Sequence, residues 1–268
     1  MQTADTSHPK LQVFDVVEEV LKGSVAHFSK MVGIVWLPGI LVLSAVLIPR
    51  FLLFTDGLDD DFAHQVRMWG DRIYMLSFLI LWPMIAVAWH RFILLGESKS
   101  AYLRFGMHEL KFVGALVMVA IPGIVLPLLA TAFFETTWRG IWLAGVRPEW
   151  TLDHLGTTLI WLLGWALGFR LSLLLPAVAL GENFSPLKAW TAMRGNFWRL
   201  SVAMVMVLAI AGVFGGIPAM IAGFVLPYPL AFVPVIVWGI FMELLTVATL
   251  SVAYKELVIA PSSQTTTQ

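Results

Sequence analysis

Two ionisable side chains stand inside long apolar stretches of this sequence. Arg170 lies in a stretch that begins near Gly156, and Glu243 lies in another that begins near Leu230. A charge in the middle of a membrane-spanning helix costs about 2.5–3.5 kcal/mol on insertion scales, so it needs an opposite charge or a function. One hypothesis is an Arg170–Glu243 pair in the interior of a helix bundle, where it would line a polar cavity or bind a lipid headgroup. The alternatives are an ion pair that only fixes helix packing and an arginine that reaches the inner membrane interface.

A second group of basic side chains lies near the ends of the apolar stretches. At this depth a cationic side chain can contact an anionic lipid headgroup. A simpler interpretation is that each residue only anchors the end of a helix. The predicted headgroup contacts are His90, Arg91, Lys111, Arg194 and Arg199.

Known catalytic signatures are missing from the sequence. It contains no glycine-rich phosphate loop, no His-Glu-x-x-His and no Gly-x-Ser-x-Gly. Cysteine is absent, which excludes disulfides, thiolate catalysis and zinc–thiolate sites. His27 and His108 lack the second histidine or carboxylate at the spacing that a metal site needs. We therefore expect a non-enzymatic protein with no metal and no cofactor, although an intramembrane enzyme with a scattered site stays open.

Membrane helices are the elements that must position these residues. Of 268 residues, 59% are hydrophobic and 13% are charged, whereas a soluble domain carries roughly 25% charge. The net charge is zero, which offers no basis for nucleic-acid binding. A span needs about 20 mainly apolar residues. Six stretches meet that length: Met31–Phe54, Ile73–Trp89, Phe112–Phe134, Gly156–Leu180, Leu200–Val225 and Leu230–Tyr254.

The orientation follows from the basic residues in the short loops. If the N-terminus is cytoplasmic, most of the 17 lysines and arginines fall in cytoplasmic segments. The acidic run Asp59–Asp61 then falls in an outer loop. Pro227 and Pro229 separate the last two spans and predict a tight hairpin. We expect a multi-pass protein of the bacterial inner membrane with both termini in the cytoplasm.

The chain also shows a threefold internal similarity. The segment His27–Gly33 resembles His108–Gly114, and Gly96-Glu97 resembles Gly181-Glu182. Each unit is expected to be a short amphipathic helix followed by a transmembrane hairpin, and residues 11–22 have the apolar periodicity of the first such helix. Chance similarity between apolar segments is the alternative. The expected division of this single membrane domain is a polar tail (1–10), three repeats (11–95, 96–180 and 181–260) and a disordered tail (261–268).

Two pairs of glycines are spaced by four residues within the spans. Gly164 and Gly168 lie in the fourth span, and Gly212 and Gly216 lie in the fifth. This spacing puts both glycines on one helix face and allows a second helix to approach closely.

One region resembles a known family. Phe169–Glu182 is an apolar helix with an arginine and a proline, and Gly195–Leu200 opens the next span with Gly-Asn-aromatic-Arg. This pattern resembles the YciC-like bacterial multi-pass proteins and the membrane domain attached to some glycerophosphodiester phosphodiesterases. The resemblance implies a helical membrane fold and says little about activity. The phosphodiesterase chemistry belongs to a separate soluble domain, so it is not expected here.

Together these patterns predict an all-α polytopic membrane protein that interacts with lipids. It would organise the membrane or act as an accessory subunit of a larger complex, with membrane lipids and other membrane proteins as partners. The alternative is a small transporter or channel with a polar site near Arg170 and Glu243. A continuous polar cavity through the bundle would favour transport, whereas a closed bundle with lipid-facing grooves would favour the first interpretation.

Overall fold

The computed structural model describes residues 9–53, 59–98, 103–143 and 150–261, and within these it leaves the side chains of 133–143 and 150–155 undescribed. All regular structure in the described residues is helical. Six stretches of these residues are long and apolar enough to cross a membrane. The chain is therefore an all-α, multi-pass membrane protein, as its composition predicts.

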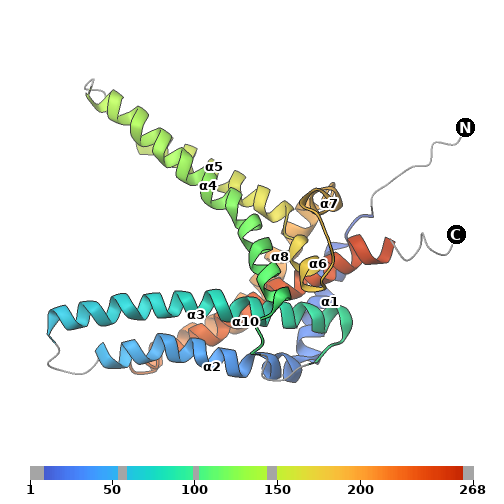
Figure 1. The fold of residues 1–268 in the computed structure, drawn as a ribbon, viewed down its shortest axis with the longest axis horizontal. Helices are drawn as coiled ribbons and strands as arrows, with labels where there is room; N and C mark the ends of the chain where they lie inside the picture. The colour runs from blue at the N-terminus through green and yellow to red at the C-terminus, as the bar shows by residue number, and fades with distance from the viewer. Residues whose placement is uncertain (1–8, 54–58, 99–102, 144–149, 262–268) are drawn as a thin grey trace, which may run out of the picture.

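The long helices form three antiparallel hairpins (Figure 1). The first pairs α2 (Phe28–Leu53) with α3 (Asp60–Leu95), and the second pairs α4 (Met107–Leu143) with α5 (Trp150–Arg170). The third has a composite first arm and a long second arm that ends in a π-helical turn. Its elements are α8 (Phe197–Ala211), the π-helical turn η1 (Gly212–Gly216), α9 (Ile217–Val225), α10 (Phe232–Tyr254) and η2 (Lys255–Ile259).

Three shorter helices gather at one end of the molecule: α1 (Val13–Ala26), α6 (Leu174–Ala179) and α7 (Pro186–Ala192) (Figure 1). The amphipathic pattern of α1 is confirmed, because Val16, Val17 and Val20 are buried and the helix packs against α8 and α10. The expected helix at the start of the second repeat is not seen. The described residues between α3 and α4, 96–98 and 103–106, have no helical structure.

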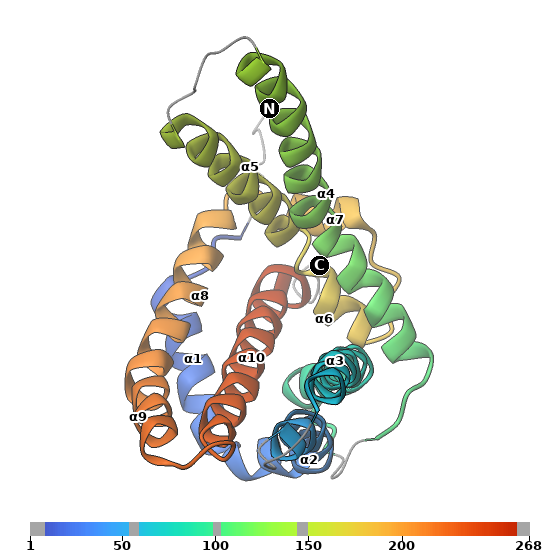
Figure 2. The same ribbon diagram turned by 90° about the vertical axis from the view of Figure 1, so that its left-hand side faces the viewer.

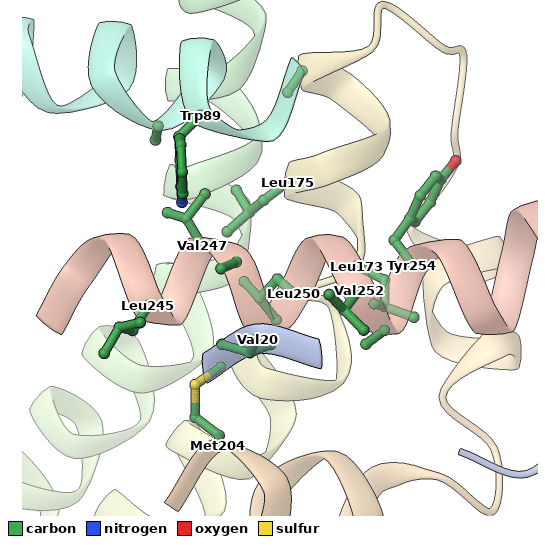
Figure 3. Packing of buried hydrophobic residues seen from close by; sticks show 14 of the residues in the cluster. Val20, Trp89, Leu173, Leu175, Met204, Leu245, Val247, Leu250, Val252 and Tyr254 are labelled. Atoms are coloured by element: carbon green, nitrogen blue, oxygen red, sulfur yellow. The ribbon is translucent and has the colours of Figure 1, made fainter. Parts of the chain in front are cut away.

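The hydrophobic core occupies only one half of the bundle. Leu81–His90 of α3 is continuously buried, and so is most of Leu244–Tyr254 of α10. With α6 and the first half of α8, these segments form what we call the packed half. Figure 3 shows its centre, where Trp89 of α3 and Val20 of α1 contact opposite sides of α10. Many apolar side chains in the remainder of the hairpins, the splayed half, are exposed, as expected for helices that face lipid.

The second hairpin diverges from the other two. Figures 1 and 2 both show α4 and α5 leaving the bundle as a separate pair. The glycine spacing explains how these two helices stay together. A Cβ on Gly164 would lie 2.6 Å from the carbonyl oxygen of Pro122, and one on Gly168 would lie 2.4 Å from that of Val119. The predicted close approach at these two glycines is therefore present.

The second glycine pair has a different environment. A Cβ on Gly212 would meet no atom within 4 Å, but one on Gly215 would lie 2.0 Å from the indole of Trp238. The π-helical turn η1 places this glycine against α10. A Cβ on Gly216 would also lie 3.1 Å from Nε1 of Trp238, so of the predicted pair only Gly216 packs closely against α10.

Two predicted spans differ from the helices observed. The second helix begins at Asp60, not near Ile73, because acidic residues in its first turn favour a helix N-terminus. The fourth span is broken after Arg170, and α6 begins only at Leu174. Pro176 explains the break, since its ring clashes with the carbonyl four residues earlier and it donates no hydrogen bond. The tails predicted at 1–10 and 261–268 lie almost wholly outside the described residues.

Candidate functional site

Arg170 lies at the end of α5, beside the short helix α7. Its guanidinium carbon stands 4.7 Å from the ring centroid of Trp190 in α7 and 5.6 Å from that of Phe197 in α8. Such cation–π contacts are worth about 0.5–2 kcal/mol, more when water is excluded. The break after Arg170 puts the charge at the carboxyl end of α5.

The predicted pair of Arg170 with Glu243 is not formed. The ion pairs of the described residues join Lys22 to Glu18, Arg91 to Glu97 and Lys255 to Glu19. Glu243 is an exposed residue of α10, and in the described part of the chain it has no hydrogen-bond partner. The guanidinium of Arg170 instead faces the aromatic rings of Trp190 and Phe197.

Arg91 connects the ends of two helices in the packed half. Its Nε and Nη2 donate to the two carboxylate oxygens of Glu97 at 3.0 and 2.7 Å, and its Nη1 donates to the carbonyl of Ala179 in α6 at 3.1 Å. Gly96, with φ of 71°, ends α3 and turns the chain so that Glu97 can reach back. The side chain predicted to contact lipid headgroups thus makes several bonds within the protein.

A second glutamate after a glycine has a similar arrangement. Gly181 has φ of 84° and follows α6, and the carboxylate of Glu182 accepts a hydrogen bond from the Tyr254 hydroxyl at 2.5 Å. Gly96-Glu97 and Gly181-Glu182 are the segments that resemble each other in sequence. Both glycines have a positive φ, and both glutamate carboxylates accept hydrogen bonds from a side chain of another element. The repeat itself remains a prediction.

The residues that carry the family resemblance anchor the N-terminal segment. The side-chain oxygen of Asn196 accepts a bond from the Leu11 amide at 2.9 Å, and its amide nitrogen donates to the Pro9 carbonyl at 2.8 Å. Nη1 of Arg199 donates to the Leu11 carbonyl at 3.0 Å. These bonds position the chain where it enters α1.

His90 has to be removed from the predicted headgroup contacts, because it is fully buried. Its Nδ1 lies 2.7 Å from the hydroxyl of Ser251, whose hydrogen goes to the Val247 carbonyl. Nδ1 is therefore the donor, and Nε2 is buried with no hydrogen-bond partner among the described residues. Lys111 and Arg194 are exposed, so their contact with headgroups remains a prediction.

A pocket of about 640 Å³ lies where α1, the end of α3 and α10 meet. We call it the rim pocket. Sequence reasoning missed it, because its walls come from three helices far apart in the chain. The only signal was the polar face of the amphipathic segment 11–22. The lining residues are Glu19, Val20, Lys22, Gly23, Ser24, Ala26, His27, Trp89, Phe92, Ile93, Gly96, Ala248 and Val252.

An apolar groove of about 360 Å³ runs between α2 and α10. We call it the α2–α10 groove. No charged side chain lines it, and both of its walls belong to membrane-spanning helices. It is lined by Phe28, Met31, Val32, Val35, Trp36, Gly39, Ile40, Leu43, Val237, Trp238, Ile240, Phe241 and Leu244.

Comparisons with protein-family models, with curated proteins and with solved structures found no match to this chain. The resemblance to the YciC-like proteins therefore rests on residues 169–200 and remains a prediction. What the fold itself establishes is a multi-pass helical membrane protein.

Proposed function

We propose that this chain is a non-enzymatic lipid-interacting protein of the bacterial inner membrane, with both termini in the cytoplasm, that organises lipids or serves as an accessory subunit. The α2–α10 groove is the observation that carries the proposal. A groove lined by apolar side chains at the depth of the hydrocarbon is filled by an acyl chain, because water there would make no hydrogen bonds to its walls.

The distribution of packing supports the same function. All three hairpins meet in the packed half, and beyond it the guanidinium of Arg50 in α2 lies over the ring of Phe232 in α10. Many apolar side chains of the splayed half are exposed. The cavities of the α2–α3 hairpin are apolar and open to the side, including one lined by Ile48, Pro49 and Ile73. A closed core with lateral grooves is the arrangement expected of a lipid-binding protein.

Transport is the second candidate function, and one observation favours it. Glu243 is exposed within the apolar helix α10 and has no partner in the described part of the chain. A carboxylate at such a position is costly and is often part of an ion pathway. Flux of ions or solutes in proteoliposomes, abolished by Glu243→Gln, would establish this alternative.

The experiment that tests the proposal is native mass spectrometry of the protein released from lipid nanodiscs. Gly39→Leu places a bulky side chain in the α2–α10 groove, and a Cβ at Gly39 meets its nearest neighbour at an ordinary 3.5 Å. The wild type is expected to retain at least one phospholipid that this variant loses.

Gly239→Leu is the matched control, because a Cβ at Gly239 in α10 meets no atom within 4 Å and the residue does not line the groove. This control should retain lipid as the wild type does. A wild type that leaves the nanodisc without lipid would overturn the proposal.

A further inference from the structure

We propose that the rim pocket binds the headgroup of a zwitterionic phospholipid that carries a primary ammonium, of the phosphatidylethanolamine type. This inference rests on the proposed lipid-binding function and assigns the headgroup that the protein selects. The pocket volume of about 640 Å³ is within the range of ligand-binding clefts.

The charges around the pocket match both ends of such a headgroup. Lys22 and His27 can donate hydrogen bonds to a phosphate, and the Glu19 carboxylate can accept them from an ammonium. An anionic headgroup such as phosphatidylglycerol would bring its negative charge toward Glu19 without a positive charge to balance that of the carboxylate. The pocket therefore favours a ligand with both charges.

The ion pairs near the pocket leave room for these contacts. Lys255 donates to Oε1 of Glu19 at 2.9 Å, and no hydrogen bond to Oε2 occurs among the described residues. Lys22 pairs with Glu18, and its ammonium has three donor hydrogens in total. Neither Lys255 nor Glu18 lines the pocket, so each ion pair can be tested separately from the pocket itself.

The pocket lies at the depth where a lipid headgroup would be expected. It lies where the span of α3 ends, at Leu95, and where that of α2 begins, at Phe28. Polar side chains of α1 form one wall, and Val20, Ala248 and Val252 provide apolar surface for the glycerol end of the lipid. The pocket is thus polar toward the aqueous side and apolar toward the bilayer.

One face of α10 leads from the rim pocket to the α2–α10 groove. Leu244 lines the groove, and Ala248 and Val252 line the pocket. Residues four apart lie on the same face of a helix. His27 lines the pocket, and the next residue, Phe28, lines the groove. We infer that the lipid places its headgroup beside His27 and an acyl chain along α2.

Gly23 provides a way to fill the pocket without disturbing the fold. A Cβ at this position meets no atom within 4 Å, and leucine is a better helix former than glycine. Gly23→Leu should therefore keep α1 helical while it occupies the pocket. Gly114→Leu in α4 is the matched control, because its Cβ also meets no atom within 4 Å.

The test is lipid retention from nanodiscs that contain equal amounts of phosphatidylethanolamine and phosphatidylglycerol. The wild type is expected to prefer phosphatidylethanolamine about two- to fivefold, as one partly exposed charge contact would give. Gly23→Leu should abolish this preference, and Gly114→Leu should preserve it.

Charge variants separate the pocket from its ion pairs. Glu19→Gln removes the acceptor for the ammonium and should abolish the preference. Lys255→Gln breaks the same ion pair but leaves the pocket lining intact, so the preference should survive. Lys22→Gln should weaken retention of both phospholipids, and Glu18→Gln should not.

The outcomes distinguish this inference from the proposed function. If lipid is retained and is lost in Gly39→Leu, but without a headgroup preference, the inference is wrong and lipid binding stands. If the wild type retains no lipid, both fail. If soluble glycerophosphoethanolamine competes as well as the whole lipid, the ligand is the free zwitterion, and assignment to a membrane lipid is overturned.

Discussion

Asn196 shows how a residue near the membrane surface can be structural and not a ligand contact. It is 1% exposed, and both ends of its side-chain amide bond to backbone groups of the N-terminal segment. Arg199 and Arg91 likewise donate to carbonyl groups of distant segments. The residues that line the rim pocket, Glu19 and Lys22, instead pair with side chains outside it.

Asn196→Ala tests this role at the residue scale. The variant leaves the Leu11 amide without its acceptor, and an unsatisfied buried polar group costs about 1–3 kcal/mol. We expect a lower midpoint of thermal unfolding in detergent and faster amide exchange at Leu11. Arg194→Ala is the control, since Arg194 is exposed; equal effects of the two changes would refute the anchoring role.

At the scale of elements, the hairpins are held by different means. The α4–α5 pair depends on Gly164 and Gly168, which bring two backbones together. In the third hairpin, the indole of Trp238 packs against Gly215 within a π-helical turn. For Gly164 and Gly168 the four-residue spacing therefore predicted the close contact correctly. For Gly212 and Gly216 it predicted the right region of the third hairpin, but only Gly216 of the pair lies at the contact.

Gly164→Leu is expected to separate α4 from α5. Its Cβ would lie 2.6 Å from a backbone oxygen, so the helices must move, and overpacking of this kind costs about 1–3 kcal/mol. The check is the thermal unfolding midpoint, followed by the fluorescence of the 12 tryptophans. Gly114→Leu, on an open face of α4, should leave the midpoint unchanged. An unchanged midpoint in Gly164→Leu would show that the close approach does not stabilise the hairpin.

At the scale of the whole molecule, the packed half joins the three hairpins, and the α4–α5 hairpin leaves the other two (Figure 2). Helices α1 and α7 lie at the packed end, together with the carboxyl ends of α3 and α10 (Figure 1). Basic residues concentrated at this end make it the cytoplasmic side in our proposal.

The orientation can be measured directly because the chain has no cysteine. Single cysteines at Lys10, Asp60 and Ala260 would occupy exposed positions on the two sides of the bundle. In intact spheroplasts a membrane-impermeant maleimide should label Asp60→Cys alone. Lys10→Cys and Ala260→Cys should react only after permeabilisation. The reverse pattern would invert the proposed topology.

Composition and periodicity by themselves determined the class of the protein. The number and approximate places of the membrane helices follow from the length of apolar runs, and the amphipathic α1 follows from its 3.6-residue period, because both are local properties of the chain. The break near Pro176 was also readable in principle, since proline acts on the helix that contains it.

Tertiary structure alone decided which residues meet. One hypothesis from the sequence paired Arg170 with Glu243, but in the structure the arginine at the end of α5 lies against Trp190. His90 carries a basic group near a helix end, yet packing against Ser251 buries it completely. The rim pocket joins side chains of α1, α3 and α10. Which side chains come into contact depends on the rotation and tilt of each helix. Rotation and tilt are set by packing against helices that are distant in the sequence, and no local pattern of residues encodes that packing.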